Sequence, residues 1–132
     1  MRQILFRGKA VESGEWHFGM WCYEGYNADF PCIIPNYIDR DAIAFNDWEV
    51  DTETVGQYTG LIDANGNKIF EGDIVTGADF DEEDGYAKIV WDEETARFSI
   101  EAKGVSFDFD NYRGNEIEVI GNIHDNPELV RR

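Results

Sequence analysis

Few residues in this chain have the types and spacing that a metal site requires. His17 and His124 are the only histidines, and Cys22 and Cys32 are the only cysteines. A structural zinc site normally shows ligands in closely spaced pairs, and these four residues form no such pair. The sequence therefore predicts no metal site and no cofactor, and we expect both cysteines to be reduced thiols.

An acidic stretch, residues 79–85, offers oxygen ligands of the kind that Ca²⁺ prefers. An EF-hand loop needs a glycine at its sixth position and a glutamate at its twelfth. Counted from Asp79, these positions hold Asp84 and Val90. The pattern fails, so we expect a solvated acidic loop, with weak cation binding as the alternative.

No arrangement of residues indicates a catalytic site. Ser13, Ser99 and Ser106 lie outside any nucleophile elbow, and 28 acidic residues make any single carboxylate pair uninformative. The glycines follow no phosphate-binding pattern. We therefore expect a protein that is not an enzyme and has no catalytic residue. The alternative is an enzyme with a cryptic site, in which His17 or His124 meets a nearby carboxylate.

Composition restricts the classes of partner. The chain has 132 residues, a formal net charge of −17 and 14% aromatic residues. The aromatic content argues against disorder, because disordered acidic chains are poor in aromatic residues. The charge argues against direct binding to nucleic acids and to anionic membranes, and it favours basic protein partners. No apolar run has the length of a membrane helix, and we expect a cytoplasmic protein.

Short segments with a period of two predict a mainly β fold. The first is a hairpin in which Trp16, Phe18 and Met20 share one face of the returning strand and His17, Gly19 and Trp21 share the other. Asn65-Gly66 predicts a tight hairpin because both residues tolerate positive φ. The predicted extended segments are residues 3–11, 16–21, 32–34, 48–55, 60–70, 74–75, 86–91, 97–101, 105–109 and 117–123. Residues 125–130 predict a cap and a helical turn.

Several motifs together resemble the YopX family, small proteins of phages and prophages. They are Ile4-Leu5-Phe6-Arg7, Gln57-Tyr58-Thr59-Gly60-Leu61, Glu71-Gly72-Asp73-Ile74-Val75, Val119-Ile120-Gly121-Asn122-Ile123-His124 and Asn126-Pro127-Glu128-Leu129. The resemblance implies a mostly β protein whose C-terminal part is similar to a small SH3-like barrel. We expect an aromatic-rich N-terminal part with a hairpin and irregular structure, residues 1–54, followed by the barrel part, residues 55–132, with one continuous domain as the alternative. It also implies work in the cytoplasm of a bacterial host, and it transfers no catalytic or ligand-binding residue.

The remaining hypothesis is an interaction protein. Aromatic side chains crowd the first half of the chain, and Trp and Tyr are enriched at protein interfaces. We expect a non-catalytic module that binds a protein, either a second copy of itself in a homo-oligomer or a basic partner. An acidic mimic of nucleic acid, which would inhibit a basic DNA- or RNA-handling protein, is the alternative. The expected surface residues are Trp16, Trp21, Tyr23, Tyr26, Trp48, Asp79, Asp81, Glu82, Glu83 and Asp84.

Overall fold

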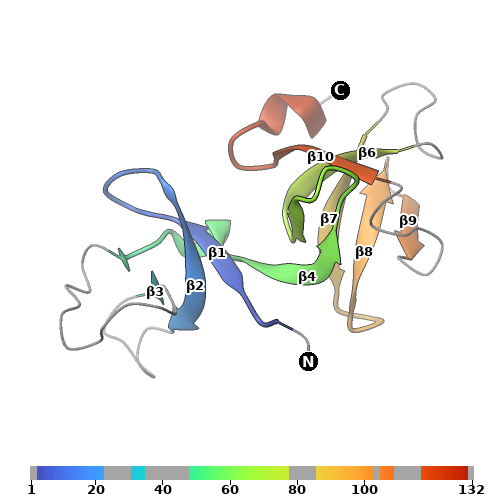
Figure 1. Cartoon of the computed structure of the whole chain (residues 1–132). Helices are drawn as coiled ribbons and strands as arrows, with labels where there is room; N and C mark the ends of the chain where they lie inside the picture. Colours follow the sequence, from blue (N-terminus) through green and yellow to red (C-terminus); the bar gives the residue numbers. More distant parts are fainter. Residues whose placement is uncertain are drawn as a thin grey trace. The chain divides into compact units, whose positions relative to one another are not determined.

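The computed structural model describes residues 3–22, 31–34, 48–77, 86–102, 105–108 and 117–130. The fold is mainly β, as predicted, and the strand pairings of the described residues are antiparallel (Figure 1). The chain divides into two compact units, Met1–Tyr58 and Thr59–Arg132. This division falls inside a strand, four residues after the predicted boundary between residues 54 and 55.

The first unit holds β3, β2, β1 and the beginning of β4, which belong to a five-stranded sheet of order β3-β2-β1-β4-β5. The strands are β1 (Phe6–Lys9), β2 (Trp16–Cys22), β3 (Cys32–Ile34) and β4 (Gly56–Ile62). The register places Arg7 opposite Phe18 and Lys9 opposite Trp16, so these four side chains share one face, as the period of two predicts. The predicted hairpin and the short extended piece at residues 32–34 are therefore confirmed.

The strand predicted at residues 48–55 is wrong. Glu49 and Val50 form only isolated bridges, and Thr52–Thr54 is a 3-10 helix, η3. The Asp51 carboxylate accepts a hydrogen bond from the Glu53 N–H at 3.1 Å and caps this helix. Side-chain capping by aspartate offers the backbone an alternative to a β ladder, which the alternating pattern did not reveal.

The second unit contains a sheet with the order β10-β6-β7-β8-β9. Four of its strands follow one another along the chain, and β10 returns to pair with β6 (Figure 1). Closure into an SH3-like barrel stays a prediction. The elements are β5 (Lys68–Phe70), which follows β4, then β6 (Asp73–Gly77), β7 (Ala87–Asp92), β8 (Arg97–Ala102), β9 (Val105–Asp108), β10 (Ile117–Asn122) and the predicted helical turn η7 (Pro127–Val130).

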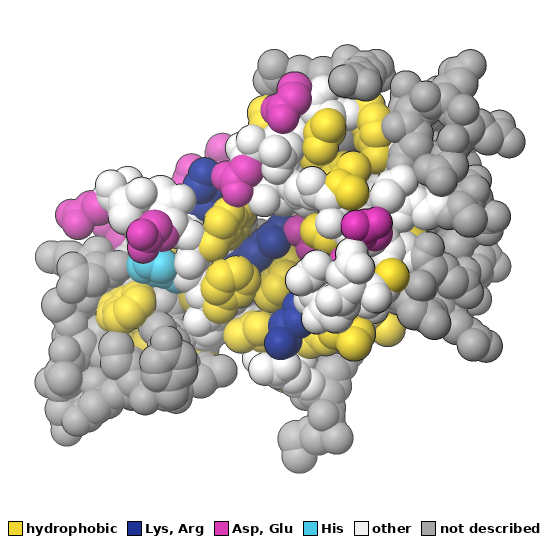
Figure 2. All heavy atoms as spheres, turned by 45° about the horizontal axis from the view of Figure 1, so that its top comes forward, with side chains coloured by type: hydrophobic (Ala, Val, Ile, Leu, Met, Phe, Trp, Pro, Cys, Tyr) yellow, Lys and Arg dark blue, Asp and Glu magenta, His cyan; other side chains and the backbone are white. Residues whose placement is uncertain are grey.

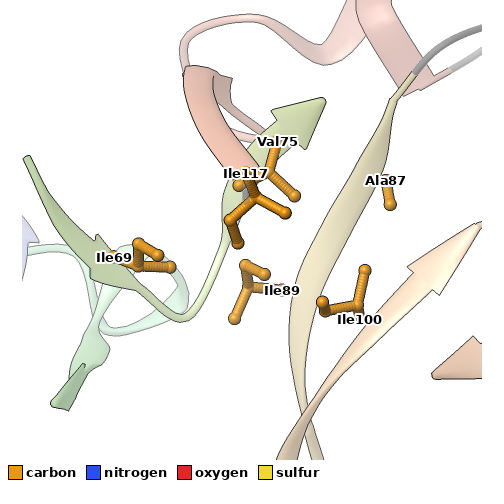
Figure 3. Close-up of a cluster of buried hydrophobic side chains, with 6 residues drawn as sticks. All are labelled: Ile69, Val75, Ala87, Ile89, Ile100 and Ile117. Atoms are coloured by element: carbon orange, nitrogen blue, oxygen red, sulfur yellow. The ribbon is translucent and has the colours of Figure 1, made fainter. Parts of the chain in front are cut away.

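The core of the second unit is a cluster of aliphatic side chains from five strands. Figure 3 shows them converging between the ribbons. Each has at most 2% of its surface exposed, and burial of an aliphatic side chain of this size stabilises a fold by about 1.5–3 kcal/mol. The cluster consists of Ile69, Val75, Ala87, Ile89, Ile100 and Ile117.

The β4–β5 hairpin is present, but its loop is longer than a two-residue turn. It spans residues 63–67, and the Asp63 N–H donates to the Asn67 carbonyl at 2.8 Å. Gly66 has a positive φ of 84°, whereas the φ of Asn65 is not positive. Only the glycine therefore uses the conformational freedom on which the prediction rested.

Asp63 ties this loop to β10. Its carboxylate accepts hydrogen bonds from the N–H groups of Asn65 (2.9 Å), Asn67 (2.8 Å) and Val119 (2.9 Å). The residue is 3% exposed. Burial alone would raise the pKa of Asp63, but the donors of Val119, Asn67 and Asn65 outweigh it and hold the pKa below its ordinary value.

We expect Asp63→Asn to destabilise the protein by about 2 kcal/mol near neutral pH, because an amide replaces the charge that these N–H groups stabilise. A lowered pKa in the folded state contributes stability that is present above the unfolded-state pKa and lost as the pH falls through the folded-state value. The difference in unfolding free energy between wild type and variant, measured by urea unfolding, should therefore narrow below about pH 4.

Asp92→Asn is the matched control, because the Asp92 carboxylate also accepts a turn N–H, that of Glu94 at 3.0 Å, but on the surface. It should cost less than about 0.5 kcal/mol. A difference in unfolding free energy between wild type and Asp63→Asn that does not change with pH would contradict the role given to the charge of Asp63.

Two buried hydroxyl groups differ in how well they are satisfied. Thr54 Oγ1 donates to the Asp51 carbonyl at 2.6 Å and accepts from the Lys9 N–H at 2.8 Å. Ser99 is 1% exposed, and its Oγ has no hydrogen-bond partner in the part of the chain that the structure describes. A buried hydroxyl without a partner costs free energy that a paired one does not.

We expect Ser99→Ala to leave stability within about 0.5 kcal/mol of wild type or to raise it, because no hydrogen bond is lost. Thr54→Val should lower stability by roughly 1–3 kcal/mol, because it leaves the Lys9 N–H without its hydrogen-bond acceptor. Thermal unfolding of the two variants measures the contrast. Equal losses of stability in the two variants would show that the Ser99 hydroxyl has a hydrogen-bond partner in the folded protein.

Candidate interaction surfaces

Seven of the ten residues predicted to form an interaction surface lie outside the described residues. These are Tyr23, Tyr26, Asp79, Asp81, Glu82, Glu83 and Asp84. The other three, Trp16, Trp21 and Trp48, belong to the first unit, and each is partly buried. The solvated acidic loop expected at residues 79–85, and weak cation binding as its alternative, thus stay untested.

Trp16 lies against two cationic side chains of β1. The guanidinium carbon of Arg7 is 4.7 Å from the centre of the Trp16 ring, and Lys9 Nζ is 5.9 Å from it. Both distances allow a cation–π interaction. Figure 2 shows cationic side chains (dark blue) directly beside hydrophobic ones (yellow). The aromatic face of Trp16 is therefore engaged within the unit.

Trp48 packs inside the first unit as well. Its ring meets that of His17 at 5.1 Å in an edge-on arrangement, and it also contacts the buried cluster of Cys22, Cys32 and Ile34. Trp21 alternates to the opposite face of β2 from Trp16. The structure therefore does not gather the three tryptophans into one surface.

The second unit carries an open hollow that the sequence did not predict. It lies along β7 and β8 and the turn between them, with a volume of about 500 Å³, which is within the range of ligand-binding clefts. Ser99 lies opposite Val90 in the register and lines its floor. The lining residues are Val90, Trp91, Asp92, Glu93, Glu94, Ser99 and Glu101.

Negative charge is concentrated in this hollow. Four of its seven lining residues are acidic. Glu101 is paired with Lys88, with Nζ to Oε1 at 3.3 Å, whereas no ion pair engages Glu93 or Glu94 among the described residues. Trp91 is 43% exposed and stacks edge-on against Phe98 at 5.0 Å, and the register puts both side chains on the opposite face of the strand pair from Val90 and Ser99. The carboxylates therefore set the chemistry of the hollow, and they suit a cationic side chain.

The turn that presents these carboxylates has an unusual backbone. Ala96 has φ 54°, a left-handed conformation that is unfavourable for a residue with a Cβ. Such conformations persist when the surroundings enforce them, and they are frequent at functional sites. The Asp92 carboxylate supports the turn through its bond to the Glu94 N–H.

The sequence contained a signal for this hollow in Trp91-Asp92-Glu93-Glu94, where a predicted strand ends in three successive acids. Because acidic residues occur throughout the chain, that signal did not stand out. What distinguishes these acids is the register of β7 and β8, which brings Ser99 and Glu101 beside them, and pairing register is not readable from one strand.

Two further features of the described residues concern metals and membranes. Within the described ranges, no group of three or more histidine, cysteine, aspartate or glutamate side chains is placed to hold a metal ion. None of the helices in the described part of the chain has the length and apolar character needed to cross a membrane.

Comparison with known proteins places the chain in a family. A crystal structure of protein EF1440 from Enterococcus faecalis has a similar fold, with a TM-score of 0.63 and 26% sequence identity, over 99% of this chain and 100% of that one. No curated protein matches the sequence. The model of the family described as "YopX protein" matches residues 8–131, which is nearly the whole chain. The resemblance seen in the motifs is thereby confirmed, and the chain belongs to the YopX family.

Proposed function

We propose that this protein is a non-catalytic interaction module, encoded by a phage or prophage, that binds a basic segment of a protein partner in the hollow of its second unit. The observation that carries the proposal is the concentration of acidic side chains around one hollow. The proposed cellular location of this interaction is the cytoplasm of the bacterial host, where the protein would meet its partner.

The acidic side chains support an arginine or lysine side chain as the occupant. The carboxylates of Glu93 and Glu94 are exposed and can pair with a cation. An arginine side chain can do so through two parallel hydrogen bonds to one carboxylate.

The net charge of the chain adds a long-range contribution. A formal charge of −17 attracts basic partners and accelerates their encounter. Salt screens such attraction beyond about 8 Å at physiological ionic strength. The hollow then supplies the short-range contacts that net charge alone does not provide.

An acidic mimic of nucleic acid is the alternative function. A mimic needs acidic groups in rows that follow the phosphates of a duplex. We favour local recognition of a basic segment, because the acidic residues Asp92, Glu93 and Glu94 are grouped at one turn beside the hollow.

We expect a short arginine-rich peptide to shift the backbone NMR signals of β7, β8 and the turn between them, with an affinity that falls as salt rises. A glutamate-rich peptide of equal length should have no effect. Changing Glu93 and Glu94 together to Gln should weaken binding roughly tenfold, because two charge-assisted contacts are lost.

The matched control changes Glu12 and Glu15 together to Gln, since these two carboxylates are also exposed but belong to the first unit. It alters the net charge equally and should change the affinity less than about twofold. Equal weakening by both double variants would show that net charge, and not the hollow, controls binding.

A further inference from the structure

Cys22 and Cys32 lie directly opposite each other in the first unit. The antiparallel register of β2 and β3 pairs Met20 with Ile34, Trp21 with Ile33 and Cys22 with Cys32. Residues in opposite register positions point to the same face of the sheet. The two thiols, ten positions apart in the sequence, therefore face each other across one strand pair.

The spacing of this pair suits a covalent link. Directly opposed residues in antiparallel strands have Cα atoms about 4.5–5.5 Å apart, and disulfides span Cα separations of about 4.4–6.8 Å. Both cysteines are free and buried, with 3% of Cys22 and none of Cys32 exposed. Burial, and then the neighbouring Cys22, raises the pKa of the Cys32 thiol to about 12.

The position of β3 controls access to these thiols. It has three residues, pairs with β2 on one side, and on the other side is held by the isolated bridge between Cys32 and Glu49 and by the hydrogen bond from the Val50 N–H to the Pro31 carbonyl at 3.1 Å. Short segments with few backbone hydrogen bonds open locally at a lower free energy than central strands. Opening of β3 would expose Cys22 and Cys32 to a small oxidant, and reclosure would bring their sulfurs together again.

We propose that Cys22 and Cys32 form a redox site, in which a peroxide converts the facing thiols into a disulfide between β2 and β3. The Cys22 thiolate attacks one oxygen of hydrogen peroxide, the O–O bond breaks, and the leaving hydroxide takes a proton to become water. Cys32 sulfur then attacks the resulting sulfenic acid, the S–S bond forms and the S–O bond breaks. The proton of the Cys32 thiol leaves with that oxygen as a second water.

The products balance: two thiols lose two electrons and two protons, and one peroxide becomes two waters. The bond would fix β3 to β2 beside Trp48 and Met20, which pack against the buried cluster of Cys22, Cys32 and Ile34. It would also close the segment between the two cysteines into a loop, which restricts the unfolded chain. The oxidised form is thus the more stable form of the first unit.

The test treats the full-length, folded protein with hydrogen peroxide. We expect both titratable thiols to disappear, the intact mass to fall by two hydrogen atoms, and a non-reducing peptide map to join the peptides of Cys22 and Cys32 within one chain. The melting temperature should rise by roughly 4–8 °C and return to its starting value after treatment with dithiothreitol.

Cys22→Ser and Cys32→Ser should each abolish the intrachain link. The peptide map of the wild-type protein decides the question even if a variant fails to fold. Persistence of both thiols, a link between two chains, oxidation to sulfinic acid without a disulfide, or a disulfide that forms only in urea would each overturn the proposal. A fall in melting temperature on oxidation would do so too, because it would show that the bond strains the native sheet.

Discussion

The buried carboxylate of Asp63 is the interaction on which the second unit depends. It joins a loop to a strand 56 positions later in the sequence, through the Val119 N–H. The Ala64 N–H also donates to the Ile117 carbonyl at 3.0 Å, so the loop and the start of β10 are linked twice. These bonds hold Ile117 where it completes the cluster with Val75 and Ile89. A single charged group therefore controls both the hairpin loop and the last strand of the sheet, and its protonation is coupled to folding.

The sequence predicted most strands because their signals are local. Alternation identified β2, and Gly72, with φ 92°, makes the turn that precedes β6. It failed at residues 48–55, where the capping carboxylate of Asp51 competes with a β ladder that alternation alone cannot exclude. The family could be recognised from turn and strand motifs, since these are the parts of the chain in which backbone geometry restricts the residue type.

The candidate sites could not be predicted in the same way, because each depends on which strands are neighbours. The hollow exists because Val90 and Ser99 are paired, and the facing thiols exist because Cys22 and Cys32 are paired. The ten-residue spacing of the two cysteines matches no closely spaced ligand pair, so nothing in the sequence indicated a reason to join them. The reduced thiols expected from the sequence are those of the structure, but their juxtaposition changes the chemistry open to them.

The position of β10 has a consequence for how the chain reaches its fold. Its partner β6 lies between β10 and β7, and their register joins Ile117 to Gly77 and Asn122 to Asp73. During synthesis, β6 and β7 emerge from the ribosome well before β10 does. Until then, one edge of β6 keeps its N–H and C=O groups open to pairing with another chain. The second unit therefore has an unpaired strand edge during the interval between the emergence of β6 and the emergence of β10.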